Sequence, residues 1–112
     1  DRFTLYNVET TPREFSSMVM LVRDALLEMK KVLDYTGDVA ANYMKMEARC
    51  RKIYVFEERG DEFYREEIRR LFTEKQSAAY MIYWKDILVD VERMLDAAAG
   101  AATLLQKLFV RV

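Results

Sequence analysis

Hydrophobic residues recur every three or four positions along most of this chain, with charged residues between them. That spacing places apolar side chains on one face of an α-helix. It predicts three long helices over residues 12–36, 39–72 and 78–110, and no β-strand. The fold class is therefore all-α, an up-down-up three-helix bundle in which the second and third helices form an antiparallel hairpin.

Residues at the ends of the predicted helices support these boundaries. Thr11, Pro12 and Glu14 fit a capping box with proline at the first helical position, so the first helix is expected to begin at Pro12. Gly37 predicts the stop of that helix, and Asp38 is placed to cap the next one. Residues 73–77 lack apolar side chains and predict the second turn.

Each predicted helix has an apolar seam that we expect to be buried. The first seam comprises Phe15, Met18, Val19, Val22, Ala25, Leu26, Met29, Val32 and Leu33. The second comprises Tyr43, Met46, Cys50, Ile53, Gly60, Tyr64, Ile68 and Leu71. The third comprises Met81, Trp84, Leu88, Val91, Leu95, Ala98, Ala102, Leu105 and Phe109. Alternating three- and four-residue steps suit helices that cross at shallow angles.

Composition narrows the function classes mostly by exclusion. The 112 residues suffice for one domain with one core, and 52% hydrophobic and 33% charged residues are typical of a compact helical protein. A net charge of −1 gives no reason to expect a nucleic-acid partner. With no His, imidazole metal sites and Ser-His triads are excluded. No nucleophile, acid–base pair or phosphate loop indicates catalysis, so the chain is not expected to be an enzyme.

Two further features concern the cellular context. The single Cys50 cannot form an internal disulfide, fits a reducing cytoplasmic compartment, and is expected to be a small buried hydrophobe. The longest uncharged stretch, residues 97–106, is too short to span a bilayer. The chain begins with Asp1 rather than Met, so we expect it to be processed or to be part of a longer chain.

Four carboxylates form the strongest candidate site. Glu57 and Asp61 are four residues apart on the second predicted helix, and Glu92 and Asp96 repeat this spacing on the third. The two pairs are equidistant from the middle of the predicted turn, so an antiparallel hairpin sets Glu57 against Asp96 and Asp61 against Glu92. Like charges at this spacing repel. Oxygen ligands suit a hard multivalent cation, which would offset the repulsion.

An alternative interpretation needs no metal. Three of the carboxylates could instead form surface ion pairs with basic residues: Asp61 with Arg65, Glu57 with Arg59 or a basic residue of the first helix, and Glu92 with Arg93. The chain would then be a helical oligomerisation or interaction module with an inert acidic patch. A neighbouring set of charges is expected to form a solvated face of the second helix: Glu62, Arg65, Glu66, Glu67, Arg69 and Arg70.

The second half of the chain closely resembles one family. The run from Phe56 to Ile68, the pair Leu71-Phe72, the run from Tyr83 to Leu88, and Glu92-x-x-x-Asp96 resemble the PhoU-like phosphate transport regulators, in the branch of accessory proteins of Pit-type phosphate transporters. The resemblance is strong over residues 53–109 and looser over the first helix. Such proteins contain two similar three-helix bundles. This chain resembles the C-terminal bundle over residues 1–112, with 1–11 as a linker or the tail of a preceding helix.

The resemblance implies a metal. In this family the acidic motifs hold multinuclear iron or zinc clusters on the bundle surface, and they match Glu57, Asp61, Glu92 and Asp96 here, which makes Fe or Zn the candidate ions. Other positions that are acidic in the family carry Val55, Arg59, Ala99 and Gly100 in this chain. This departure favours one weakly held ion, or none, over a multinuclear cluster.

The resemblance also implies partners. A PhoU-like accessory factor modulates inorganic phosphate transport by binding a phosphate transporter or a sensor protein, and it reaches the membrane peripherally through that partner. We also expect self-association, or pairing with a sister bundle, through apolar side chains left exposed. Candidates near the bundle ends are Phe3, Tyr6, Tyr35 and Leu108.

Overall fold

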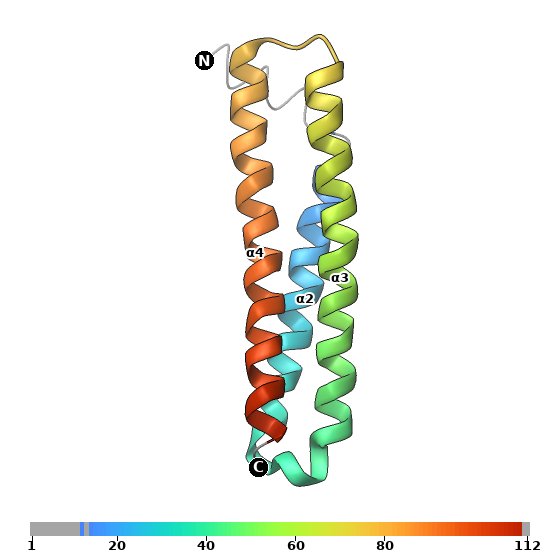
Figure 1. Ribbon diagram of the computed structural model, residues 1–112, viewed down its shortest axis with the longest axis vertical. Helices are drawn as coiled ribbons and strands as arrows, with labels where there is room; N and C mark the ends of the chain where they lie inside the picture. Colours follow the sequence, from blue (N-terminus) through green and yellow to red (C-terminus); the bar gives the residue numbers. More distant parts are fainter. Residues whose placement is uncertain (1–11, 13, 111–112) are drawn as a thin grey trace.

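The computed structural model describes residue 12 and residues 14–110, which form a helical bundle. Its elements are α2 (Phe15–Asp34), the 3₁₀ turn η1 (Tyr35–Asp38), α3 (Val39–Thr73) and α4 (Ala78–Val110). Helices that follow one another in the chain run antiparallel, and α2 packs along the α3–α4 hairpin (Figure 1). The rod is 55 × 25 × 16 Å in extent. The described residues contain no strand, so the all-α bundle is confirmed.

The start of α2 differs from the sequence prediction. The helix begins at Phe15 rather than Pro12, and the side chain of Glu14 at the N-cap makes no capping hydrogen bond. Instead, the backbone N–H of Glu14 donates to Oε1 of Glu67 on α3, at 3.1 Å. A buried carboxylate from another helix therefore takes the capping role, where it also favours the positive end of the α2 dipole. Thr11 lies outside the described residues.

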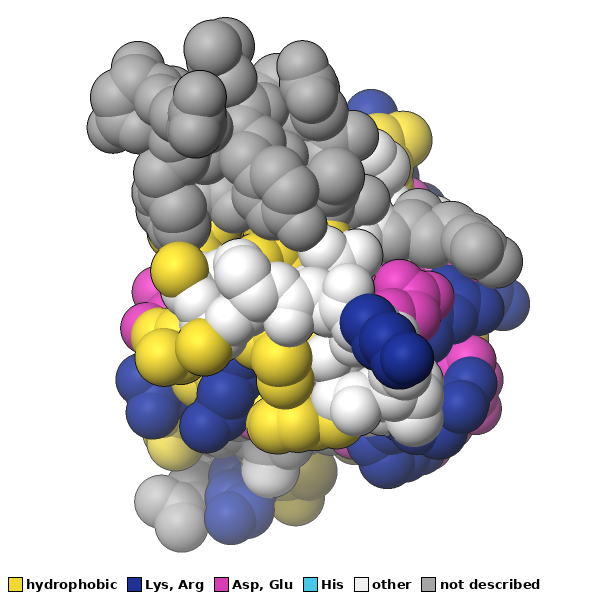
Figure 2. All heavy atoms as spheres, turned by 90° about the horizontal axis from the view of Figure 1, so that it is seen from above, with side chains coloured by type: hydrophobic (Ala, Val, Ile, Leu, Met, Phe, Trp, Pro, Cys, Tyr) yellow, Lys and Arg dark blue, Asp and Glu magenta, His cyan; other side chains and the backbone are white. Residues whose placement is uncertain are grey.

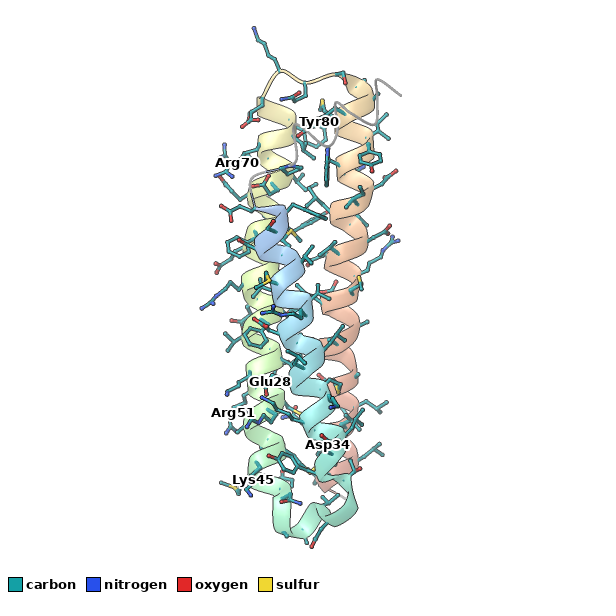
Figure 3. The ribbon with its side chains drawn as sticks, turned by 180° about the vertical axis from the view of Figure 1, so that it is seen from behind. Glu28, Asp34, Lys45, Arg51, Arg70 and Tyr80 are labelled. Atoms are coloured by element: carbon teal, nitrogen blue, oxygen red, sulfur yellow. The ribbon has the colours of Figure 1, made fainter. Side chains whose placement is uncertain are left out.

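Glu67 was expected on a solvated face, and that prediction was wrong. Its side chain is only 2% exposed, because it is enclosed between α3 and the start of α2. Its charge is balanced by Arg70, whose Nη1 donates to Glu67 Oε1 at 2.8 Å. Figure 3 shows Arg70 at this end of α3. The arrangement ties the beginning of one helix to the end of another.

The connection between α2 and α3 confirms one predicted signal and contradicts another. Asp38 caps α3, with its Oδ1 accepting the N–H of Ala41 at 3.1 Å. Gly37, however, does not stop α2 in a left-handed conformation, since no described glycine has a positive φ. The helix already ends at Asp34, and a right-handed 3₁₀ turn carries the chain into α3.

The α3–α4 hairpin follows the prediction closely. The first helix of the pair ends at Thr73, one residue later than expected, and α4 has the predicted bounds. Glu74 is extended, and the Oγ atom of Ser77 accepts the N–H of Tyr80 at 3.1 Å, which caps the start of α4. The two helices lie side by side over their whole length (Figure 1).

Most predicted seam positions lie in the core. Fully buried side chains come from all three helices: Met18, Ala25, Val32, Met46, Cys50, Ile53, Leu88, Leu95 and Ala102. The clear exceptions are on α2, where Val19, Leu26 and Leu33 are between 43 and 52% exposed. These three were expected to be buried. They remain exposed because α2 packs more extensively against α3 than against α4.

The outer surface differs from helix to helix. Figure 2 looks down on the end with the α3–α4 turn, where charged side chains gather on the side of α3 and hydrophobic ones on the side of α4. Within the described part of the chain, none of the helices has the length and apolar character that crossing a bilayer requires.

Candidate functional site

The four predicted carboxylates converge in the structure. Each of Glu57, Asp61, Glu92 and Asp96 offers one oxygen, and these four oxygens all lie within 4.8 Å of one another. We call these four residues the carboxylate cluster. Asp96 is exposed and the other three are half-buried, so the cluster lies at the edge of the α3–α4 seam.

Close packing of the two helices positions the cluster. Gly60, one residue before Asp61, is buried, and a Cβ atom added to it would lie 2.3 Å from Cδ1 of Leu95. Leu95 itself immediately precedes Asp96 and is fully buried. The missing side chain of Gly60 therefore lets α4 approach α3 where the acidic residues flank the contact. A glycine on an apolar seam beside Asp61 was the sequence signal for this close approach.

The cluster has no cationic partner among residues 14–110. None of its four carboxylates forms an ion pair there, and Arg93 instead lies 4.0 Å from Asp90. The surface pairs that would have made the cluster an ordinary acidic patch are therefore not formed. Arg65 acts on Asp61 only as a neighbouring positive charge.

Two carboxyl groups in the cluster have strongly raised pKa values. Burial is the main cause for Glu92, whose pKa rises to about 8, followed by its hydrogen bond with Asp61 and the charges of Asp61, Asp96 and Glu57. The pKa of Glu57 rises to about 7, first through a hydrogen bond with Asp61, then through burial and the charges of Asp61 and Asp96. These two carboxyl groups therefore titrate near neutral pH and not near pH 4.5.

Asp61 behaves in the opposite way. The hydrogen bond from Glu92 is the largest cause that lowers the pKa of Asp61, followed by the hydrogen bond from Glu57 and the charge of Arg65. When Glu57 and Glu92 are protonated, each can therefore donate a hydrogen bond to the ionised Asp61. A cation that bound all four oxygens would displace those protons, so its affinity would increase with pH.

One oxygen of the cluster has unused hydrogen-bonding capacity. Glu92 Oε2 is buried and has no hydrogen-bond partner in the described structure; the indole Nε1 of Trp84 is in the same situation. Leaving such a buried atom unpaired costs about 1–3 kcal/mol. A cation bound through Oε2 would provide the missing partner for Glu92.

The available ligands limit the choice of ion. The cluster offers carboxylate oxygens alone, the donor type that suits Mg²⁺, Mn²⁺ and other hard cations, whereas Zn²⁺ sites usually include nitrogen or sulfur. The positions that depart from the family pattern add no oxygen ligand: Val55, Arg59 and Gly100 are exposed and Ala99 is half-buried. Among the positions that are acidic in the family, only Glu57, Asp61, Glu92 and Asp96 therefore offer a carboxylate here.

An apolar hollow of about 250 Å³ lies elsewhere, beside the α3–α4 turn. Its lining residues are Phe72, Ala78, Met81, Ile82 and Lys85. No carboxylate lines it, so the hollow and the cluster are separate features of the hairpin.

Comparison of this chain with protein-family models, with curated proteins and with solved structures gives no match. The PhoU-like assignment therefore rests on the sequence motifs, and the function that it implies stays a proposal.

Proposed function

We propose that this chain is a regulatory binding protein of the PhoU-like kind, which modulates inorganic phosphate transport and binds one metal ion at the carboxylate cluster. The observation that supports the metal is the convergence of four carboxylate oxygens within 4.8 Å of one another. Such a group is self-repulsive when ionised, and an ion that binds only the folded state stabilises it by mass action.

The ion would act on the hairpin. Two ligands come from α3 and two from α4, so bound metal would link these helices without contacting α2. Iron is our first candidate, since it is one of the two metals that the family resemblance implies and the other, zinc, is usually bound with nitrogen or sulfur ligands. Zinc is the second. The partner would be a phosphate transporter or a sensor protein on the cytoplasmic side of the membrane.

A second candidate function is a metal-free helical interaction module. The exposed apolar residues of α2, including Leu26 at 52% and Leu27 at 51%, favour it, because large apolar surfaces tend to mark interaction sites. Here the carboxylate cluster would be held together by its protons alone. Self-association and pairing with a sister bundle both belong to this interpretation.

Metal content and thermal melting separate the two. Protein purified without chelator is analysed for bound metals, and its melting temperature is then measured in EDTA and with Fe²⁺, Zn²⁺, Mn²⁺ or Mg²⁺. We expect at least one ion to raise the melting temperature in a saturable way, with a stabilisation of about 2.7 kcal/mol at a hundredfold excess over its Kd. A melting temperature indifferent to all four ions, in protein without metal, would refute the metal site and leave the metal-free module as the candidate.

Matched variants locate the effect. E57Q combined with D96N removes one ligand from each helix and should abolish stabilisation by the ion. The control combines E58Q with E62Q, which neutralises two exposed carboxylates of the same helix α3 and should leave the ion effect unchanged. Regulation is tested separately, by phosphate uptake in cells with and without the chain. Unchanged uptake would refute the regulatory role and leave metal binding standing.

A further inference from the structure

The side of the bundle that faces away from α3 has an apolar surface on α2. Glu28, labelled in Figure 3, marks the α3 side of α2, because its Oε2 lies 3.2 Å from Nη1 of Arg49 on α3. Leu26 lies two residues earlier, roughly 200° around the helix, and so points away from α3. Val19 and Leu33 fall within about 40° of the opposite side by the same geometry. These three side chains are 43, 52 and 52% exposed in chain order.

The spacing of this surface indicates what kind of partner it fits. Val19, Leu26 and Leu33 are seven residues apart, and Met20 and Leu27 form a second row with the same interval, 46 and 51% exposed. A seven-residue apolar repeat is the pattern that packs against another helix at a shallow angle. A lipid surface requires no such period. We call this surface the outer face of α2.

Two basic residues lie within the outer face. Arg23 and Lys30 are exposed and also seven residues apart, between the two apolar rows. Lys30 forms no ion pair within residues 14–110. Arg23 lies 3.0 Å from its neighbour Asp24, but with 57 and 37% of these side chains exposed the pair is weak and leaves the guanidinium accessible.

Exposed acidic residues on the adjacent helix lie nearer one end of this face. The rings of Phe15 and Trp84 are in contact, with centroids 5.0 Å apart, so the first turn of α2 is level with the start of α4. By the same geometry the exposed Asp86 and Asp90 of α4 lie roughly level with residues 17 and 21 of α2, before Arg23. Met94 of α4, 52% exposed, adds an apolar side chain further along.

We propose that the outer face of α2 binds an amphipathic α-helix of a partner protein, one that presents a seven-residue apolar repeat flanked by acidic residues. The row formed by Val19, Leu26 and Leu33 would give the partner its register along α2. Arg23 and Lys30 border this row and would select an acidic over a basic flank. This inference names a partner for the regulatory role proposed above and is independent of the metal, because the outer face shares no residue with the carboxylate cluster.

Designed peptides test the proposal. Two labelled peptides of three heptads carry Leu at positions a and d and either Glu or Lys at the flanking e and g positions; like charges keep each from pairing with itself. In fluorescence anisotropy, in EDTA, the Glu peptide should bind the chain at least about tenfold more tightly than the Lys peptide. Equal binding of both peptides, or binding of neither, would overturn the proposal.

Variants of the chain distinguish charge selection from nonspecific apolar binding. R23E combined with K30E should reverse the preference, so that the Lys peptide binds more tightly than the Glu peptide. L26E should weaken both peptides at least about tenfold. V55E is its control, since Val55 on α3 is 50% exposed and lies outside the face; it should change nothing. An unreversed preference in the charge variant would refute the role of the two basic residues.

Other occupants of the face give different results. Analytical ultracentrifugation of the chain alone would reveal a dimer that L26E dissociates if a second copy covered the face. If a membrane covered the outer face, the wild-type chain would co-sediment with vesicles containing anionic lipid. R23E combined with K30E would not. Either result would overturn the helix proposal in favour of that occupant.

Discussion

Gly60 of α3 and Leu95 of α4 lie so close together that even a methyl group on Gly60 would displace the leucine side chain. A Cβ atom on Gly60 would lie 2.3 Å from Leu95 Cδ1, and Leu95 is 0% exposed. The Leu95 side chain would have to move, and because it is fully buried its neighbours would have to repack with it. This contact fixes the separation of the two helices beside Asp61 and Asp96.

The first prediction compares two glycines. G60A should lower the free energy of unfolding by about 1–3 kcal/mol, because forced repacking around Leu95 exceeds the gain in helix propensity. G100A is the control: a Cβ there meets nothing within 4 Å, so it should stabilise the fold by about 0.5–1 kcal/mol. Urea denaturation measures both. Equal effects of the two substitutions would show that the Gly60 contact is not tight.

The second prediction concerns pH. Glu57 and Glu92 have folded-state pKa values of about 7 and about 8, above their ordinary value of 4.5. Between about pH 4.5 and about pH 8 the folded state binds more protons than the unfolded state. The stability conferred by the raised pKa values is therefore complete below about pH 4.5 and is lost as the pH rises towards 8. In EDTA we expect a loss on the order of 1–3 kcal/mol over this window, allowing for solvent screening.

Substitution identifies the groups responsible for that slope. E92Q should flatten the decline and raise stability at pH 8, since the buried carboxyl can no longer ionise. E58Q, at an exposed position on α3, should keep the wild-type slope. Denaturation curves recorded from about pH 5 to about pH 8 provide the comparison. A decline that persists unchanged in E92Q would contradict the assignment.

The third prediction concerns Glu67. E67A leaves the N–H of Glu14 without its acceptor and removes the buried partner of Arg70, so the unfolding free energy should fall by about 2–4 kcal/mol. E67Q retains an acceptor oxygen and should cost less, about 0.5–1.5 kcal/mol. E66A, which breaks exposed ion pairs with Arg69 at 2.6 Å and with Arg70 at 3.4 Å, is expected to cost less than about 1 kcal/mol. Equal costs for E67A and E66A would be inconsistent with a buried cap.

The fourth prediction uses the single cysteine. Cys50 is 0% exposed, and burial raises the pKa of its thiol, so a disulfide reagent should react with it only when the bundle opens. We expect labelling in native conditions to be slower than in urea by a factor of roughly 10³ or more. In a C50S background, S16C supplies an exposed thiol on α2 as the control, and it should react at once. Rapid native labelling of Cys50 would place it outside the core.

Long apolar seams made α3 and α4 predictable, because the seven-residue pattern alone determines which faces meet. The cluster followed from the hairpin, since equal distances from the turn put Glu57 opposite Asp96. The start of α2 could not be predicted in this way: its cap is Glu67, 53 residues away in the sequence, and no local motif reveals such a partner. The exposure of Leu26 also escaped prediction, because a seam residue can equally face its own bundle or a partner.

The contact between Phe15 and Trp84 makes tryptophan fluorescence an intrinsic probe of the start of α2. Trp84 is the only tryptophan, it is 6% exposed, and its ring meets the first residue of α2 edge-on. Its fluorescence should therefore change when the beginning of α2 detaches from the hairpin, even if α3 and α4 stay paired. The thiol of Cys50 monitors the opposite half of the rod, 34 positions away along the sequence. Recording both during denaturation shows whether the bundle opens from one end or all at once.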